Sequence, residues 1–424
     1  MTESLTHANE EDYARRSRPG ALARAARRAL LSRLEGIEDA VLVLKDADGS
    51  HRFGPRESDL EARIDVHDSR FYGALARRGS VGAAESYMDG HWSSEDLPSV
   101  IRVLARNAGL GQVDRGITRL IQPGLKLLHA LRRNHRRGAR RNIAAHYDLG
   151  NDFFSLFLDP SLTYSSAVFE RSDMSLEEAQ TAKYERLCRK LELKPGDRVL
   201  EIGGGWGGFA LHAASRHGCH VTSATISREQ YELSRKRVAQ AGLEDRVDIL
   251  FCDYRDLEGT FDKLVSIEMI EAVGVRHLPD FFRVCSERLR ADGLMALQAI
   301  LVPDQAWKSS VRNVDFVKRY IFPGGQLVSL GAISRCIAAK TDLRIIHLED
   351  ITSHYAETLL RWRRALHERL DDVRALGLDD GFLRMWDFYF CYCSGGFAER
   401  AILGNQIVFS KARARREPVL GALA

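Results

Sequence analysis

The chain contains no Cys-X-X-Cys motif, although it has seven cysteines. The cysteine count is odd, and several of these residues stand in apolar stretches typical of strands or helices. These features disfavour both a disulfide framework and a zinc site. We therefore expect reduced thiols and no bound metal.

Long hydrophobic runs are also missing, since no stretch approaches the roughly 18 apolar residues that a membrane-spanning helix needs. Residues 1–20 are polar and lack the apolar core of a signal peptide. We expect these residues to be disordered. The protein is then expected to be cytoplasmic, and to touch the inner face of the membrane without crossing it.

An excess of one charge is lacking as well, because the net charge is only +4 over 424 residues. Six arginines nevertheless gather in residues 132–141, "RRNHRRGARR". Such a run has three open interpretations: a solvated linker, a contact with anionic lipid headgroups, or a contact with nucleic acid. We favour an anionic membrane surface as the partner and expect no nucleic acid.

The length suggests two domains. We expect a small α+β domain associated with lipid or membrane at residues 21–125, a basic linker at 126–145 and a larger domain at 146–415. The small domain combines a basic amphipathic helix, Ala21–Leu34, with a strand, Val41–Lys45. Residues of about 303–340 interrupt the rhythm of the larger domain and are expected to form an inserted cover.

The larger domain alternates strands with helices. Ser175 and Glu178 form a capping-box pattern before one helix, and Ser227 and Gln230 form another. Alternation of this kind predicts a doubly wound α/β domain that binds ligands beyond the carboxyl ends of parallel strands. The apolar segments expected to form the first five strands are "RVLEIG", "HVTSATI", "VDILFCD", "KLVSIEM" and "LMALQAI".

A glycine-rich loop, "EIGGGWGG", joins the first of these strands to a helix, and it contains a GxGxxG pattern. A nicotinamide enzyme normally has an acid at the end of the second strand for the ribose hydroxyls. Thr225 stands there instead, while Asp253 ends the third strand, where it suits an adenine amine. This arrangement favours S-adenosylmethionine (SAM) over a nicotinamide dinucleotide, which remains a minor alternative.

Several motifs in order resemble the cyclopropane-fatty-acyl-phospholipid synthase family, over residues of about 40–410. They are "GSVGAAESYMDGHW", "HYDLGNDFFSLFLDPSLTYSSAVFE", "VLEIGGGWGGFA", "TISREQ", "DYRDL", "IEMIEAVG", "RYIFPGG" and "HYAETL". The resemblance implies a class I SAM-methyltransferase fold, Rossmann-like, with a mostly parallel seven-stranded sheet. It also implies an enzyme that adds the SAM methyl carbon to a cis double bond in the acyl chain of a membrane phospholipid.

The resemblance assigns a cofactor site and a catalytic site, position by position. The implied cofactor residues are Tyr164, Ser165, Gly203, Gly205, Thr225, Gln230, Asp253 and Tyr254. In the family, a bound bicarbonate acts as the base and is held by a glutamate, a histidine, a tyrosine and two backbone amides. The corresponding positions here are Glu271, Gln298, Tyr355, Ser166 and Ile300.

Two of these positions depart from the family pattern: Gln298 replaces the histidine, and Ser166 replaces a cysteine. Glutamine can donate a hydrogen bond but cannot carry a proton. The change at Ser166 matters little if the family uses only the backbone N–H. Both changes bear on the bicarbonate site and hence on the product. A cyclopropane ring remains an alternative, but we favour a product with an exocyclic methylene, which a flavin-dependent reductase partner would convert to a methyl branch.

Other interpretations of the sequence remain open. A nucleic-acid methyltransferase would normally carry an Asn/Asp-Pro-Pro-aromatic motif after the fourth strand, where this chain has Glu268-Met269-Ile270-Glu271. An inactive lipid-binding homologue is made possible by the changes at the bicarbonate site. Full-length relatives also suggest a homodimer. Candidates for lining an acyl channel, or alternatively for ordinary core, are Phe153, Phe154, Phe157, Tyr164, Phe316, Tyr320 and Phe322.

Overall fold

The computed structural model describes residues 21–107 and 150–415, which fall into two compact units. The first unit joins the N-terminal part of the chain to Asn313–Ile321 and Trp362–Ala401, and the second contains the remainder. The sequence predicts a single boundary, so it misses these two later segments of the first unit. The predicted disordered residues 1–20, and the linker at 126–145 with its basic segment, lie outside the described residues.

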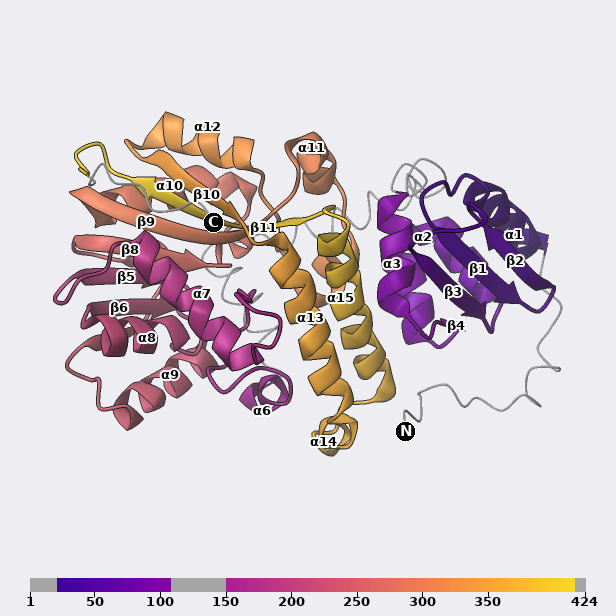
Figure 1. Ribbon diagram of the computed structural model, residues 1–424, viewed down its shortest axis with the longest axis horizontal. Coiled ribbons are helices and arrows are strands. Elements are labelled where there is room, and N and C mark those ends of the chain that lie inside the picture. The colour runs from indigo at the N-terminus through magenta and orange to yellow at the C-terminus, as the bar shows by residue number, and fades with distance from the viewer. Residues whose placement is uncertain (1–20, 108–149, 416–424) are drawn as a thin grey trace. The chain divides into compact units, whose positions relative to one another are not determined.

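A four-stranded sheet of order β2-β1-β3-β4 lies in the first unit (Figure 1). Only β1 and β3 pair in parallel. Along β3, buried Ala62, Ile64 and Val66 alternate with exposed Glu61 and Arg63, as expected for a strand with one face on a core. The strands are β1 (Val41–Asp46), β2 (Gly49–Phe53), β3 (Glu61–Val66) and β4 (Trp92–Ser93).

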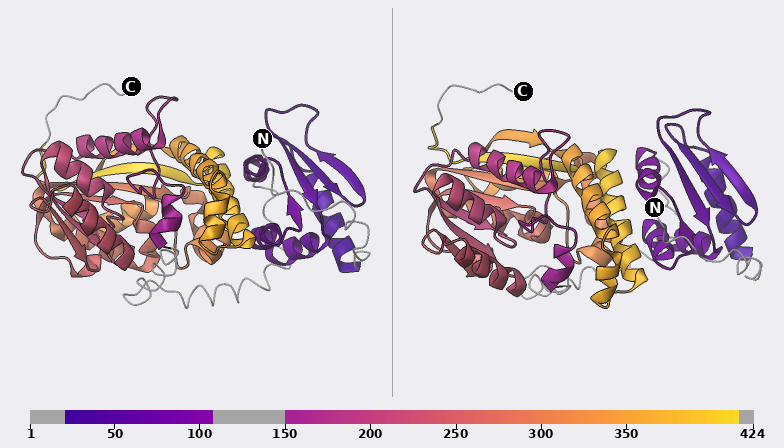
Figure 2. Two further views of the ribbon diagram at one scale, coloured as in Figure 1. Left: turned by 90° about the horizontal axis from the view of Figure 1, so that it is seen from below. Right: turned by 60° about the horizontal axis from the view of Figure 1, so that its bottom comes forward.

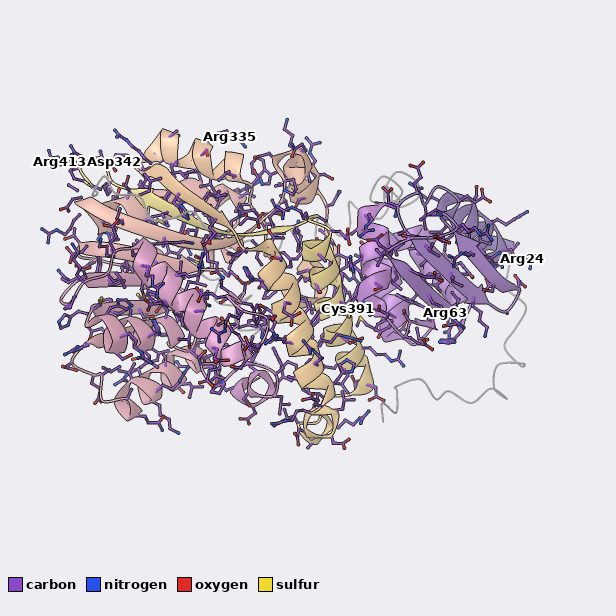
Figure 3. All side chains as sticks on the ribbon, in the orientation of Figure 1. Arg24, Arg63, Arg335, Asp342, Cys391 and Arg413 are labelled. Carbon is purple, nitrogen blue, oxygen red and sulfur yellow. The ribbon has the colours of Figure 1, made fainter. Side chains whose placement is uncertain are left out.

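Helices complete the first unit. The side chains of Arg24 in α1 and Arg63 in β3 are exposed, whereas Cys391 in α15 is buried (Figure 3). Helix α15 approaches α3 so closely that a Cβ atom on Gly395 would lie 2.7 Å from Ile101 Cγ2. The helices are α1 (Ala21–Leu34), α2 (Arg70–Met88), α3 (Leu97–Arg106), the end of α13 (Thr352–His367), α14 (Leu370–Ala375) and α15 (Asp380–Ala398).

The second unit is built on a seven-stranded sheet of order β10-β11-β9-β8-β5-β6-β7. Strands β5 to β9 pair in parallel, and β11 lies antiparallel between β9 and β10. The predicted mostly parallel α/β sheet is therefore confirmed. The strands are β5 (Arg198–Ile202), β6 (His220–Thr225), β7 (Val247–Phe251), β8 (Phe261–Ile267), β9 (Leu289–Leu301), β10 (Arg344–Asp350) and β11 (Leu403–Ser410).

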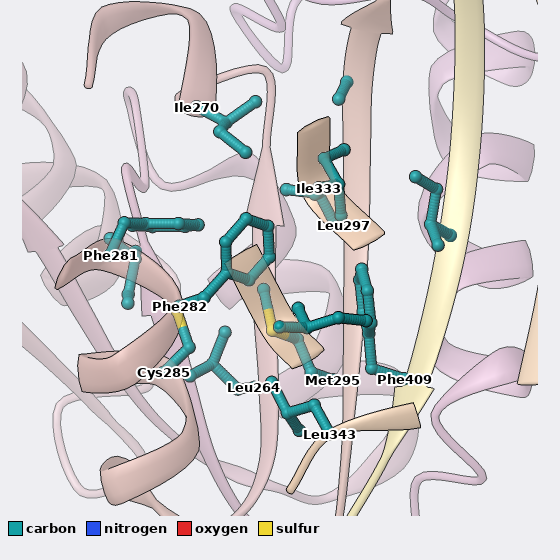
Figure 4. Packing of buried hydrophobic residues seen from close by; sticks show 14 of the residues in the cluster. Leu264, Ile270, Phe281, Phe282, Cys285, Met295, Leu297, Ile333, Leu343 and Phe409 are labelled. Atoms are coloured by element: carbon teal, nitrogen blue, oxygen red, sulfur yellow. The ribbon is translucent and has the colours of Figure 1, made fainter. Parts of the chain in front are cut away.

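Helices cover both faces of this sheet (Figure 2). Successive residues of a strand point to opposite faces, so Leu264 packs in one buried cluster and Val265 in the other. The larger cluster joins Phe281 and Phe282 of α10 to Met295 of β9, as Figure 4 shows. The helices are α6 (Gly150–Ser155), α7 (Leu176–Lys190), α8 (Gly208–His217), α9 (Arg228–Gln240), α10 (Leu278–Arg288), α11 (Asp304–Arg312), α12 (Leu330–Lys340) and the first part of α13.

Two sequence expectations need adjustment. The predicted cover at 303–340 is not one body, because Asn313–Ile321 belongs to the first unit while α12 packs into the core beside α10 through Ile333 and Ile337. The capping box of Ser175 and Glu178 is complete at the start of α7. The one at Ser227 and Gln230 is only half formed, since Gln230 turns its side chain elsewhere. All seven cysteines are free, and no helix among the described residues is both long and apolar enough to cross a membrane.

Candidate active site

The glycine loop follows β5 and leads into α8. Gly203 and Gly205 have positive φ angles of 85° and 54°, a conformation that glycine adopts without strain. The N–H of Gly203 donates to the carbonyl of Ala224 at 2.9 Å, which ties the loop to the end of β6. A Cβ atom built on Gly205 would meet no atom of the described residues within 4 Å. The loop therefore leaves open space beside Gly205, on the side where the family resemblance expects SAM.

Thr225 and Gln230 lie together after β6. The Thr225 hydroxyl donates to Gln230 Oε1 at 2.9 Å and accepts the N–H of Ser227 at 3.2 Å. This contact explains why the Gln230 side chain leaves the capping box. Both side chains are polar and nearly buried at the carboxyl edge of the sheet, where they suit the ribose hydroxyls.

Asp253 and Tyr254 follow β7. The Asp253 carboxylate is held by Arg255, which donates from its backbone N–H at 3.1 Å, from Nε at 2.7 Å and from Nη2 at 2.6 Å. The Tyr254 ring contacts Phe281 edge to face, with centroids 5.5 Å apart. Arg255 thus fixes the acid that the sequence assigns to the adenine amine, and sequence reasoning gave this arginine no role.

Ser165 contacts a charged residue that sequence reasoning missed. The ammonium of Lys183, on α7, is buried and donates to Ser165 Oγ at 2.8 Å. Burial lowers the pKa of Lys183 to about 7. The signal in the sequence was a lysine on the face of α7 that also carries Ala179, Leu187 and other buried residues.

The aromatic candidates for an acyl channel separate into two groups. Tyr164 lies against the rings of Phe154, Phe157 and Phe322, and Phe153 packs on the first two of these phenylalanines. Phe316 and Tyr320 belong to the first unit. The five aromatic residues of the second unit therefore remain candidates for a common apolar wall.

Glu268, which follows β8 directly, collects three hydrogen bonds on its carboxylate. Oε1 accepts the backbone N–H of Ser166 at 3.0 Å and Nε2 of Gln298 at 2.8 Å, and Oε2 accepts the Tyr355 hydroxyl at 2.6 Å. The hydroxyl of Ser166 turns away to the Ala167 carbonyl. Of Ser166, only the backbone N–H therefore serves this carboxylate.

The backbone of Glu268 is unusual, since its φ is 49°. A side chain in this left-handed region costs on the order of 1–2 kcal/mol. Burial raises the pKa of Glu268, while Tyr355, Gln298, the Ser166 amide and Lys183 oppose that rise. The residue as a whole is of intermediate exposure.

Glu271 lies one turn further on, in the 3-10 helix Ile270–Ala272. Its Oε1 accepts the N–H of Ile300 at 2.5 Å. Its Oε2 is shielded from solvent and has no hydrogen-bond partner within residues 21–107 and 150–415. Burial, with the nearby charge of Glu268, raises the pKa of Glu271 to about 8.

The five predicted catalytic positions thus come together, but not around Glu271. Ser166, Gln298 and Tyr355 converge on Glu268, and only Ile300 contacts Glu271. The sequence shows two acids, Glu268 and Glu271, three residues apart after β8. It does not predict that the backbone of Glu268 has a positive φ or that the predicted donors contact Glu268.

Bicarbonate does not fit this arrangement. The donors that the family resemblance assigns to it at Ser166, Gln298 and Tyr355 are already used by the carboxylate of Glu268. The residues for SAM do fit, because the space beside Gly205 and the polar pair of Thr225 and Gln230 lie at the same sheet edge.

A cluster of potential metal ligands lies elsewhere. The ligand atoms of Cys188, His212 and His217 lie within 4.8 Å of one another. Both histidines, however, place Nε2 against Glu185 Oε2, at 3.3 and 3.0 Å. These hydrogen bonds account for the two imidazoles, so no metal is assigned there.

Comparisons with known proteins show what this chain is similar to. The family model for mycolic acid cyclopropane synthetase matches residues 134–407. Tuberculostearic acid methyltransferase UfaA1 of Mycobacterium tuberculosis is 42% identical over 341 residues, which cover 76% of this chain and 78% of that protein. The cyclopropane-fatty-acyl-phospholipid synthase of Escherichia coli K12 is 36% identical over 356 residues, 82% of this chain and 88% of that one.

A solved structure is also similar. The mycolic acid cyclopropane synthase CmaA1, complexed with SAH and CTAB, has a TM-score of 0.60 at 32% sequence identity. The match covers 64% of this chain and 98% of that chain.

Proposed function

The chain belongs to the mycolic acid cyclopropane synthetase family, and from this premise we propose that it modifies unsaturated acyl chains of membrane phospholipids. It is a SAM-dependent methyltransferase acting on fatty acyl chains. The methyl carbon is added to the cis double bond, and the product carries an exocyclic methylene. The alternative is a cyclopropane.

One observation carries the proposal: two acidic side chains, Glu268 and Glu271, lie after β8 at the edge of the sheet that also bears the glycine loop. When bound, SAM supplies a methyl carbon activated by its sulfonium. Addition of that carbon to an alkene leaves a carbocation. A carboxylate in a site of low polarity stabilises such a positive charge more strongly than it would in water.

The roles of the other residues follow from their contacts. Thr225 and Gln230 are placed to bind the ribose, and Asp253, held by Arg255, to bind the adenine amine. Tyr164 and the phenylalanines around it provide an apolar wall for the acyl chain. Tyr355 and Gln298 hold the Glu268 carboxylate in place.

The methylene product is supported by two facts. Gln298 stands where the family pattern has a histidine, and the chain is 42% identical to a protein named as a tuberculostearic acid methyltransferase. In this route a hydride first moves between the two former alkene carbons. Loss of a proton from the new methyl group then gives the methylene.

The proposal includes partners. The six arginines of residues 132–141 attract an anionic membrane surface, with about 1 kcal/mol for each cation near it. The enzyme would act as a homodimer at the inner face of the membrane. A flavin-dependent reductase would then reduce the methylene to a methyl branch.

The test is to incubate the purified protein with SAM and vesicles of a monounsaturated anionic phospholipid, and to analyse the released fatty acids. A gain of one CH2 together with vinylidene proton signals in the NMR spectrum supports the proposal. Upfield cyclopropane ring protons would instead establish the alternative product. The absence of any CH2 gain on all unsaturated lipids tested would contradict both.

A further inference from the structure

We propose that the carboxylate of Glu268 is the base that removes the proton from the newly added methyl group, and that this enzyme therefore needs no bound bicarbonate. The inference rests on the proposed function and adds to it the identity of the base. Glu268 is then a catalytic residue in place of an external anion.

The contacts of Glu268 support this role. Its carboxylate accepts hydrogen bonds from Ser166, Gln298 and Tyr355, the three positions where the family resemblance places donors to a bicarbonate ion. A carboxylate and a bicarbonate share the same pair of equivalent oxygens. An anion built into the chain therefore takes the donors that a bound ion would otherwise use.

The carboxylate keeps room to accept a proton. Among the described residues, Oε1 accepts two hydrogen bonds, whereas Oε2 accepts only that of Tyr355. A carboxylate oxygen has two lone pairs, so Oε2 retains one that is not engaged. This oxygen is the acceptor that we assign to the methyl proton.

Glu268 is one of four described non-glycine residues with a positive φ, and of these four it is the one whose side chain meets the predicted catalytic positions. Glu268 has a φ of 49°, a conformation that favours glycine, and its N–H donates to the Gln298 carbonyl at 2.8 Å. Strained residues of this kind persist where the surrounding structure holds them, and they cluster at active sites. Here the strained residue carries a carboxylate that accepts from three donors.

The neighbouring acid helps to keep Glu268 charged. The pKa of Glu271 is raised to about 8, so Glu271 is mostly protonated at neutral pH. The pair then holds one negative charge, and the three donors place that charge on Glu268. Burial raises the pKa of Glu268 above its ordinary value, which makes it a stronger base than an exposed glutamate.

The proton transfer balances without another reactant. The alkene electron pair forms the bond to the methyl carbon as the S–CH3 bond breaks, and the thioether leaves with that bond's electrons. After the hydride shift, a C–H bond of the methyl group breaks and its electrons form the C=C bond of the methylene. The proton goes to Glu268 Oε2, and release of the proton to solvent restores the carboxylate.

The experiment compares wild type with Glu268→Gln and Glu268→Gly in degassed buffer with and without added ¹³C-bicarbonate. Glutamine keeps the shape without the charge, and glycine suits the positive φ while opening the space of the side chain. Glu258→Gln is the matched control, since Glu258 is exposed in the loop before β8. Binding of S-adenosylhomocysteine by calorimetry reports whether each variant is folded.

We expect wild type to transfer the methyl carbon equally well with and without bicarbonate, and to show no bound ¹³C-bicarbonate signal by NMR. Glu268→Gln should lose at least about a hundredfold in kcat while still binding S-adenosylhomocysteine, as expected for loss of a general base. Glu268→Gly should lose similar activity and regain part of it when bicarbonate is added. Glu258→Gln should match wild type.

Two results would overturn the inference while leaving the proposed function intact: wild type stimulated severalfold by bicarbonate, or a Glu268 variant that keeps near wild-type kcat. A wild-type protein that modifies no lipid would instead refute the proposed function, and the inference with it. Whether wild type modifies lipid therefore distinguishes a failure of the proposed function from a failure of the inference about Glu268.

Discussion

The Gln406 carboxamide donates a hydrogen bond of 2.9 Å to Oε1 of Gln298, and Gln298 Nε2 in turn donates to the Ser166 carbonyl at 3.2 Å, so that both ends of the Gln298 amide are held. With its oxygen engaged there, Gln298 presents its NH2 group to Glu268. Gln406 is oriented in the same manner, because its own oxygen accepts from Lys190, whose ammonium can only donate. Two residues that do not touch Glu268 thus orient one of its donors.

Gln406→Glu tests this orientation. The new carboxylate can still pair with Lys190 but cannot donate to Gln298, so the Gln298 amide oxygen loses its donor and only the Nε2 contact with the Ser166 carbonyl still holds the amide. We expect kcat to fall about tenfold, in line with the loss of one hydrogen bond to a charged group. The acid limb of the pH–rate profile should move to higher pH, because Glu268 loses a donor to its charged form. An unchanged profile would assign Gln406 a merely structural role.

Tyr355→Phe removes the hydroxyl that donates to Glu268 Oε2 at 2.6 Å. Hydrogen bonds to charged groups contribute about 1.5–3 kcal/mol, so kcat should fall between about tenfold and a hundredfold. The pKa of Glu268 should rise, and activity should therefore be lost most at low pH. Steady-state kinetics between about pH 6 and 9 would show this, and an equal loss at every pH would contradict it.

Glu271→Gln should change how stability depends on pH. The pKa of Glu271 is raised from 4.5 to about 8, so the folded chain holds a proton that the unfolded chain releases between these values. The contribution of Glu271 to stability therefore declines as the pH rises from about 4.5 to about 8. The variant, which cannot titrate there, should lose less stability than wild type over this range. Thermal unfolding at several pH values checks this, and parallel curves would contradict it.

Asp387→Ala should destabilise the first unit. The buried Asp387 carboxylate accepts from Tyr87 at 2.6 Å and Arg363 at 2.7 Å and contacts His367 at 2.7 Å, and its pKa is lowered to about 2. Removal of one partner from a buried ion pair costs about 3–5 kcal/mol.

Asp372→Asn is the control for Asp387→Ala, since the Asp372 side chain is 58% exposed in α14. A surface change of this kind should alter the free energy of unfolding by less than about 0.5 kcal/mol. Similar denaturation midpoints for the two variants would contradict the role given to Asp387.

Gly205→Ala tests the space beside the glycine loop. Gly205 has a φ of 54° and an open Cβ position, and Gly218, at the end of α8, has a φ of 66° with only ordinary contacts of 3.5 Å. Both alanine variants should cost a similar 1–2 kcal/mol of backbone strain. Only Gly205→Ala should weaken binding of S-adenosylhomocysteine, by at least about tenfold, as calorimetry can measure. If the Gly205→Ala and Gly218→Ala variants bound S-adenosylhomocysteine with equal affinity, Gly205 would not line the cofactor site.

The sequence predicts regular elements well where a local pattern determines them. The apolar segments of β5 to β9 alternate with helices, and the Ser175 capping box marks the start of α7. The sequence did not predict that the first unit contains three separate chain segments. Asn313–Ile321 and Trp362–Ala401 pack with the N-terminal part only through contacts between residues far apart in the chain, and no local pattern predicts such contacts.

In the candidate site, too, the sequence predicts some features, while others depend on contacts between distant residues. The resemblance to the family brings Ser166, Gln298 and Tyr355 into one site, but the carboxylate they surround depends on the positive φ of Glu268. No local sequence pattern predicts that backbone conformation. Gln230 likewise leaves its capping box because Thr225 offers a hydroxyl across the loop, a contact between residues on different elements.

The most direct test of the proposed function is a ¹³C NMR spectrum of monounsaturated phospholipid after incubation with the enzyme and SAM labelled with ¹³C in its methyl group. We expect the labelled carbon to appear as a vinylidene CH2 within the acyl chain. A labelled cyclopropane carbon would contradict the assigned product, and no label in any acyl chain would contradict the proposed function.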